Sequence, residues 1–392
     1  MKCKKIIPLI LICCLMSGCW DKVEIDRKSF ISTIAIDEGK DIDKEKELKE
    51  IKPGETFEEE NFKKITITYG FPDISELGPE KGGTGKEKFI KTDAYSMQDA
   101  FTQMASKTSR SIHFGHVKLL ILSEKLMEYP ETLKEIFDYL ERKPCLNKMM
   151  EVVVAKGRAE DYVKYQPVME KNIESYITGL MENSTRNSSI LPMSLNELLI
   201  LLYQNGNAII PSIYFDKLKD EIDLSGVAVI KDYKLEGYLE EKETSALEIL
   251  RGKIQGGKQT IIKNGHPVDY EISGTDRRIE LVDDDIDKLK VRIDIKLEGV
   301  LRGYILEGEV FSKNDISEFQ NNFNDSIEKQ CEKVVRITQD KFSVDPIGIR
   351  EYLERFHPSV YKKVKDNWDE AYKNADIDVN VQTRIRRIGV TK

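Results

Sequence analysis

The chain has 392 residues, of which 40% are hydrophobic and 33% charged, and these proportions exclude collagen-like, mucin-like and wholly disordered proteins. Its length is enough for two or three compact domains with cores of their own. Sixty-nine Asp and Glu residues against 61 Lys and Arg residues give a net charge of −8. A chain of this sign repels phosphate backbones, so we expect no nucleic acid among its partners.

The first 18 residues have the layout of a secretory signal peptide. Lys2, Lys4 and Lys5 precede an apolar stretch of about ten residues, and the small pair Ser17-Gly18 follows it. Such a stretch is too short to span a membrane as a helix. We therefore expect the chain to be exported.

The residues Leu15 to Cys19, Leu-Met-Ser-Gly-Cys, resemble the lipobox of bacterial lipoproteins. In a lipobox the cysteine thiol takes a diacylglyceryl group and becomes the first residue of the mature protein. Cys19 is thus the predicted lipid-attachment site, and no cofactor beyond this covalent lipid is expected. Two acyl chains would anchor the protein stably, since each buried CH₂ contributes about 0.8 kcal/mol. The alternative is a plain signal peptide with a chance cysteine.

Two cysteines remain in the predicted mature body, Cys145 and Cys331. They are too few and too far apart to define a disulfide framework. Cys331 lies in an amphipathic helical stretch, which favours a buried apolar residue over a reactive thiol.

The first half of the chain alternates between strand and helix patterns, which indicates a mixed α/β arrangement. The segment 40–64 has 16 charged residues among 25 and is predicted to be a solvated, mobile excursion between two strands. Ser96 is the predicted cap of a helix whose apolar stripe is Met97, Phe101, Met104 and Ala105. Strands are predicted at 30–37, 65–69, 117–122 and 149–155, and further helices at 132–140 and 159–165.

Two more helices are predicted at 170–182 and 195–203. The second begins with the capping-box pattern Ser194-x-x-Glu197. Residues 198–202 are five consecutive aliphatic residues, so this helix is either deeply buried or a contact surface. We favour burial, because exposed aliphatic helices are rare on soluble surfaces.

Strand patterns dominate the start of the second half, and a long amphipathic helix follows. The predicted fold class is α+β, or mixed α/β, and multi-domain, with a C-terminal antiparallel sheet packed by that helix. We divide the chain into a signal peptide (1–18), an N-terminal mixed α/β region expected to form two lobes (19–221) and a C-terminal α+β domain (222–392). The predicted elements of the second half are a hairpin at 226–239, helices at 245–250 and 316–341, short helices around His357-Pro358 and Trp368, and strands at 291–297 and 377–385.

No motif for catalysis is recognisable, and we predict neither catalytic residues nor a metal site. The Gly-rich segment 78–88 lacks the P-loop pattern and is expected to be a surface loop. His113 and His116 have no partner ligands at a recognised spacing. The run Asp283-Asp284-Asp285 is typical of a solvated loop. Paired carboxylates of an exported hydrolase could still hide among the many acids, so that alternative stays open.

Four blocks of the sequence resemble the Ger(x)C family of spore germination lipoproteins, the C subunits of GerA-type nutrient germinant receptors. The first block is Gly18 to Ile25, which contains the Cys-Trp-Asp start expected of the mature chain. The other three follow in order and extend the resemblance over the whole chain. They are residues 115–126, residues 226–239, and Trp368 to Glu370 together with Ile385 to Gly389.

The resemblance implies an endospore-forming organism and a lipoprotein on the outer face of the cell membrane, which is the inner membrane of the spore. It implies integral-membrane A and B subunits as partners, and no catalytic activity. Cys19 carries over as the lipid site. Trp20, Asp21 and Glu24 match the family start, and they either fold back onto the body or contact a partner or the lipid.

Two other functions remain open besides that of a non-catalytic receptor subunit. One is a lipid-anchored solute-binding protein that captures the nutrient itself, which would need a cleft between two similar lobes. The other is the exported hydrolase.

Overall fold

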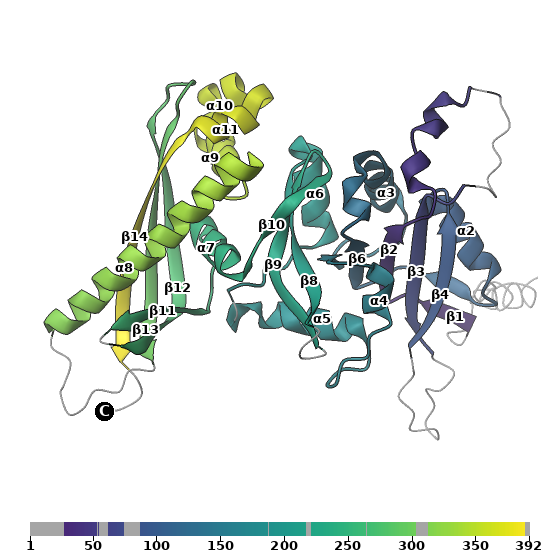
Figure 1. Ribbon diagram of the computed structural model, residues 1–392, viewed down its shortest axis with the longest axis horizontal. Helices are drawn as coiled ribbons and strands as arrows, with labels where there is room; N and C mark the ends of the chain where they lie inside the picture. The colour runs from purple at the N-terminus through teal and green to yellow at the C-terminus, as the bar shows by residue number, and fades with distance from the viewer. Residues whose placement is uncertain are drawn as a thin grey trace, which may run out of the picture.

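The computed structural model describes residues 27–52, 54, 62–73, 87–186, 188–216, 221–263, 265–302 and 313–388. Within them lie an eight-stranded sheet, a four-stranded sheet and a small two-stranded sheet. Figure 1 shows the two larger sheets side by side along the longest axis, with helices between and around them.

The eight-stranded sheet has a parallel centre and antiparallel edges. Its strand order is β10-β9-β8-β7-β6-β2-β3-β4. The four central strands run parallel, and a hairpin is added antiparallel at either side. The strands are β2 (Thr33–Glu38), β3 (Ile65–Pro72), β4 (Glu87–Ala94), β6 (Leu119–Ser123), β7 (Glu151–Ala155), β8 (Ala208–Asp216), β9 (Glu221–Lys231) and β10 (Lys234–Leu239).

Helices cover both faces of this sheet, because its central strands are apolar on both sides. On β6, Leu119 and Ile121 belong to one apolar core, while Leu120 and Leu122 belong to the other. One face is covered by α4 (Ala159–Val163) and α5 (Ile173–Glu182), and the other by α2 (Met97–Ser106), α3 (Pro130–Arg142) and α6 (Leu195–Asn205).

The four-stranded sheet confirms the predicted α+β class but corrects one detail. Its order is β11-β12-β13-β14, and the last strand joins β13 in parallel, so the sheet is not wholly antiparallel. The chain between β13 and β14 crosses over through helices and returns to the end where β13 began. The strands are β11 (Lys258–Lys263), β12 (His266–Asp283), β13 (Lys290–Arg302) and β14 (Asp376–Ile388).

The crossover begins with α8 (Lys313–Arg336), which lies across β14 and β11. The apolar side of this amphipathic helix is buried at Phe319, Phe323 and Ile327, and Cys331, buried as predicted, is 0% exposed and free. Burial also raises the pKa of the Cys331 thiol, which makes it less reactive. Cys145 is free and exposed. The crossover continues through the π-helix η9 (Ile337–Phe342), α9 (Ile349–Phe356), α10 (Pro358–Val364), the 3₁₀ turn η10 (Lys365–Asn367) and α11 (Trp368–Asn374).

Helix α7 (Glu241–Arg251) joins the two larger sheets. It contacts β9 on one side and α8, β12 and β13 on the other. The seven consecutive residues from Thr244 to Leu250 are therefore buried. Strand β9 pairs with β8 and β10 pairs with β9, so the eight-stranded sheet continues past residue 221, where we divide the chain from its sequence.

Two local expectations are wrong, and a third is refined. The strand expected at 30–37 is two strands, since β1 (Lys28–Phe30) pairs with β5 (Ser111–His113) before β2 begins. Ala105 is exposed, and Ala100 is buried on α2 in its place. The segment 40–64 connects the paired strands β2 and β3 as expected, and most of its described side chains are exposed, but it contains the 3₁₀ turns η3 (Ile42–Lys44) and η4 (Glu47–Glu50). Ile42 is 1% exposed and belongs to the core.

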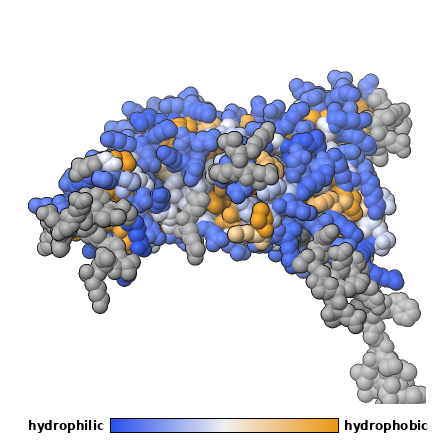
Figure 2. Space-filling model, turned by 60° about the horizontal axis from the view of Figure 1, so that its bottom comes forward, coloured by the Kyte–Doolittle hydropathy of each residue, from blue (hydrophilic) through white to orange (hydrophobic). Residues whose placement is uncertain are grey.

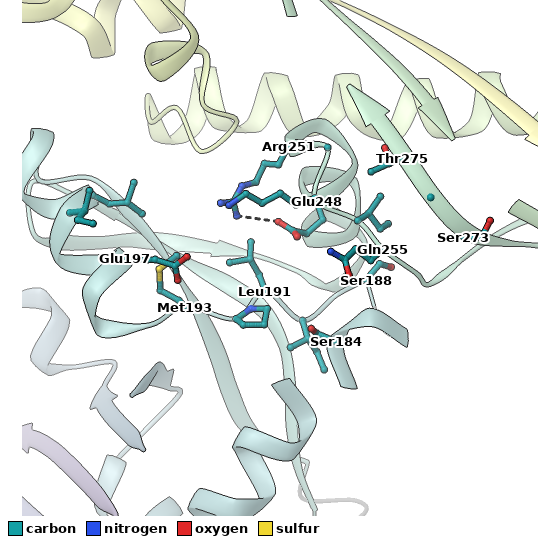
Figure 3. Close-up of a pocket in the computed structure, with 18 residues that line it drawn as sticks. Ser184, Ser188, Leu191, Met193, Glu197, Glu248, Arg251, Gln255, Ser273 and Thr275 are labelled. Atoms are coloured by element: carbon teal, nitrogen blue, oxygen red, sulfur yellow. Dashed lines mark hydrogen bonds and ion pairs between the residues drawn. The ribbon is translucent and has the colours of Figure 1, made fainter. Parts of the chain in front are cut away.

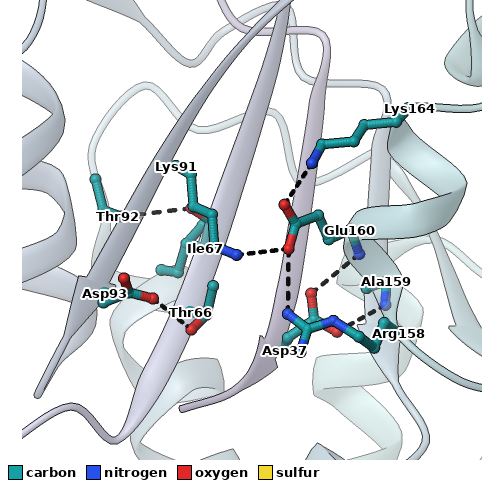
Figure 4. A network of polar contacts seen from close by, with 10 residues as sticks. All are labelled: Asp37, Thr66, Ile67, Lys91, Thr92, Asp93, Arg158, Ala159, Glu160 and Lys164. Carbon is teal, nitrogen blue, oxygen red and sulfur yellow. Dashed lines mark hydrogen bonds and ion pairs between the residues drawn. The ribbon is translucent and has the colours of Figure 1, made fainter. Parts of the chain in front are cut away.

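A buried carboxylate ties β2 to α4 (Figure 4). Asp37 is 0% exposed and accepts hydrogen bonds from the backbone N–H groups of Ala159 (2.7 Å) and Glu160 (3.0 Å). Burial raises the pKa of Asp37 to about 6 despite these bonds. Burial also acts to raise the pKa of Glu160, but hydrogen bonds from Lys164 and Lys91 lower it to about 2.

The raised pKa of Asp37 predicts a pH-dependent stability. The folded state binds this proton more tightly than the unfolded state, so the contribution of Asp37 falls by up to about 3 kcal/mol as the pH rises from about 4 to about 7. Urea unfolding of Asp37→Asn across that range should lack this fall. Asp161→Asn is the control, because Asp161 is exposed on α4, the helix whose N–H groups Asp37 binds. This variant should keep the wild-type slope. Parallel curves for wild type and Asp37→Asn would contradict the assignment.

Candidate functional site

The residues that the sequence predicts for lipid attachment and contact, Cys19, Trp20, Asp21 and Glu24, lie outside the described residues. The first described strand is β1, at the end of the molecule remote from the four-stranded sheet (Figure 1). Among the described residues no helix is long and apolar enough to cross a membrane.

The other residues weighed from the sequence are not brought together in a site. His113 and His116 both lie against the ring of Phe30, with centroids 5.7 and 4.9 Å away. The described residues contain no group of three His, Cys, Asp or Glu side chains that could hold a metal ion. The Asp283–Asp285 run is exposed after β12. Most of the Gly-rich segment 78–88 lies outside the described residues.

A groove of about 890 Å³ lies between α6 and the C-terminal end of α7. Figure 3 shows Arg251 and Glu248 on the α7 side, with Glu197 and Met193 across from them. Serine and threonine side chains from the η8 turn (Asn183–Arg186), the loop after it and β12 complete the wall: Ser184, Ser188, Ser273 and Thr275.

The α6 wall is positioned by its caps. Ser194 accepts a hydrogen bond from the N–H of Glu197 (3.3 Å), and Glu197 accepts one from the N–H of Ser194 (3.2 Å), which is the predicted capping box. The helix ends at Gly206, whose φ of 77° is left-handed. The expected full burial of α6 is wrong, because Ile200 is 51% and Tyr203 88% exposed.

The α7 wall carries an ion pair and ends in a hydrogen-bonded turn. Arg251 donates to Glu248 over 3.1 Å, although burial still raises the pKa of Glu248. The N–H groups of Gly252 and Lys253 bond the carbonyls of Ile249 (2.9 Å) and Glu248 (3.1 Å), which closes the helix in a Schellman motif.

Arg277 of β12 lies across this helix end. Its guanidinium donates 3.0 Å hydrogen bonds to the carbonyl oxygens of Leu250 and Ile347. A Cβ at Gly252 would stand 2.6 Å from the Arg277 Cβ, so only glycine allows the approach. Three cations from two distant segments, Arg251, Lys253 and Arg277, are thereby brought together.

A smaller cavity of about 270 Å³ adjoins the groove and shares Leu201, Arg251 and Lys253 with it. Asp345 on its wall accepts hydrogen bonds from the backbone N–H groups of Ile347 (3.1 Å), Gly348 (3.0 Å) and Arg350 (2.8 Å). Burial, with the nearby charge of Glu351, raises the pKa of Asp345 to about 7. Arg277, Arg350 and Trp368 also line this cavity.

Sequence reasoning missed this site. The pattern Arg251-Gly252-Lys253 signals a helix C-terminus, which is an ordinary place for cations. Nothing in the sequence around residues 251–253 indicates that Arg277, Arg350 and Trp368 lie beside this helix end.

Apolar side chains are also exposed away from the groove. In the loop between α4 and α5, Val168 is 94% and Met169 92% exposed. Figure 2 shows one face of the molecule as mostly hydrophilic, with apolar residues gathered in a few separate patches.

The close approach at Gly252 predicts a sensitive position. Gly252→Ala combines a left-handed φ of 64° with the clash at Arg277 and should lower the free energy of unfolding by about 1–3 kcal/mol. Gly274→Ala, where a Cβ would meet nothing within 4 Å, should change it by less than about 0.5 kcal/mol. Urea unfolding of both variants measures the difference. Equal effects would show that Arg277 does not pack as described.

The fold and the groove define a non-repetitive α+β protein with two unlike sheets joined by a buried helix. Two family models match it in tandem: "Spore germination protein N-terminal domain" over residues 21–214 and "Spore germination B3/GerAC like, C-terminal" over residues 225–389. The chain therefore belongs to the Ger(x)C family of spore germination proteins.

Individual relatives match over nearly their full length. Spore germination protein YndF of Bacillus subtilis (strain 168) is 28% identical over 410 residues, which cover 100% of this chain and 99% of the relative. Spore germination protein B3 of the same organism is 24% identical over 380 residues, 95% of each chain. The crystal structure of the GerBC protein has the same fold, with a TM-score of 0.58 at 22% identity over 82% of this chain and 94% of that one.

Proposed function

We propose that this protein is a lipid-anchored, non-catalytic subunit of a nutrient germinant receptor, attached through Cys19 and acting by contacts with integral-membrane A and B subunits. The observation that carries the proposal is the tandem match of both family models across residues 21–389. The lipobox-like sequence that ends at Cys19 supports the anchor.

Anchoring and partner contacts support each other physically. A chain held at the membrane has a high effective concentration near membrane-embedded partners, so interfaces of modest affinity suffice. Exposed Met and aromatic side chains, such as Met169 and Tyr203, are of the kind that protein interfaces use.

Capture of the nutrient by a cleft between two similar lobes has less support. The groove lies between unlike parts, since one wall belongs to the eight-stranded sheet's helix α6 and the other to α7 and β12 of the smaller sheet. This arrangement therefore does not resemble the two matched lobes of a solute-binding protein.

The anchor is tested by Cys19→Ala. Without the thiol no diacylglyceryl group can attach, so we expect the variant to be retained as an uncleaved precursor or released from the membrane, with membrane-bound mature protein lost. Fractionation of sporulating cells and immunoblotting measure this. Cys145→Ala, which removes an exposed cysteine of the body, should fractionate like the wild type. Normal maturation and membrane retention of Cys19→Ala would contradict the anchor.

The receptor role is tested in spores. A deletion strain should release dipicolinate more slowly than its parent in response to one class of nutrient, and the wild-type gene should restore the response where Cys19→Ala does not. Pull-down of A and B subunits with the tagged wild-type protein tests the partners separately. A full response of the deletion strain to every nutrient, with no co-purifying membrane subunit, would overturn the proposal.

A further inference from the structure

Four cationic side chains lie at the junction of the two cavities, and four carboxylates, Glu197, Glu248, Asp345 and Glu351, line the same cavities. Arg251 and Lys253 line both cavities, and Arg277 packs against Gly252 between them. Arg350 lines the smaller cavity from the opposite side, on α9. These cations come from three segments of the chain, so the fold and not a local charge run brings them together.

Three of these four carboxylates are already engaged, and Glu351 is the fourth. Glu197 completes the capping box of α6, Glu248 pairs with Arg251, and Asp345 accepts three backbone N–H groups. Lys253 forms no ion pair with a described residue. The charge of Arg251 is the main cause that lowers the pKa of Lys253, and burial adds to it. For Arg277 burial is the main cause that lowers the pKa, and the charge of Arg251 adds to it. The cations therefore repel one another, although the charges of Asp345 and Glu351 act in the opposite direction on Arg277.

Hydrogen-bond donors are also left over around the two cavities. Trp368 is 4% exposed and lines the smaller cavity, and its indole N–H has no partner in the described part of the chain. The Nε–H of Arg350 and the hydroxyl of Thr275 are also buried and have no partner among the described residues. Buried polar groups in native proteins are nearly always paired, so unpaired donors at a cavity indicate a ligand or water that accepts their bonds.

Neutralising the C-terminal end of α7 does not account for all four cations. The Schellman bonds satisfy the carbonyls of Glu248 and Ile249, and Arg277 reaches that of Leu250. Lys253 and Arg350 are not needed for that task.

We propose that this cationic junction, formed by Arg251, Lys253, Arg277 and Arg350, binds a small oxyanion, a carboxylate or phosphate group. Charge-assisted hydrogen bonds from these side chains suit such a group, and the unpaired N–H groups of Trp368 and Arg350 add neutral and charged donors. The cavities of about 270 and 890 Å³ are large enough for the rest of a small organic molecule. This site does not depend on the lipid anchor or on the partner subunits.

The test uses the full chain, purified in mild detergent, at constant ionic strength with chloride as the reference anion. Isothermal titration calorimetry with inorganic phosphate and with succinate gives the affinity. Vesicles that contain phosphatidylglycerol form a third arm, which distinguishes a lipid headgroup from a soluble ligand. The chain has two tryptophans, so in a Trp20→Phe background the emission of Trp368 reports binding at the cavity.

Lys253→Gln should weaken binding about tenfold or more, because it removes a charged donor from an exposed site without a structural bond. Lys242→Gln removes the same charge at the opposite end of α7 and should bind like the wild type. Binding of phosphate or succinate that depends on Lys253 places the oxyanion on a soluble molecule. Binding of the vesicles alone, with the same dependence, places it on a lipid. No binding in any arm, or equal binding by Lys253→Gln and wild type, would overturn the proposal.

Discussion

The burial of helix α7 between the two larger sheets is the constraint on which the rest of the molecule depends. The seven residues from Thr244 to Leu250 are enclosed by β9 on one side and by α8, β12 and β13 on the other. Each fully buried Leu or Ile contributes about 1.5–3 kcal/mol, so Leu247, Ile249 and Leu250 alone account for a substantial part of the adhesion between the sheets. The core is continuous across this helix, and the two parts are therefore held in one arrangement.

The same constraint places the candidate site. Because α7 is fixed by its buried length, its C-terminal end is held opposite α6, and the groove opens between them. The left-handed turn at Gly252 lets Arg277 cross that end at close range. The grouping of these cations is thus a consequence of how the sheets are joined. The buried N–H groups of Trp368 and Arg350, which have no partner among the described residues, are not required by the joining and are left for a ligand.

The proposed anchor and the groove belong to different parts of the molecule. The family relation extends along the whole chain and concerns spore germination, and the proposed anchor belongs to residues ahead of β1. The groove lies at the far side of the eight-stranded sheet from β1 and β4, beside α7 (Figure 1). A ligand there would contact both walls at once, α6 on the larger sheet's side and α7 with β12 on the other.

The sequence by itself determined the local elements, because caps and hydrophobic periodicity act over a few residues. Ser96 and Ser194 mark helix starts correctly, and the alternation at 377–385 correctly predicts the last strand. Only the tertiary structure decided that β14 joins β13 in parallel, since pairing partners far apart in the chain leave no local pattern. It also decided that Ile200 and Tyr203 are exposed on an aliphatic helix, and that Arg277 and Trp368 meet at one cavity. Burial and convergence depend on which distant surfaces pack together, and that is settled by the balance of apolar contacts over the whole chain.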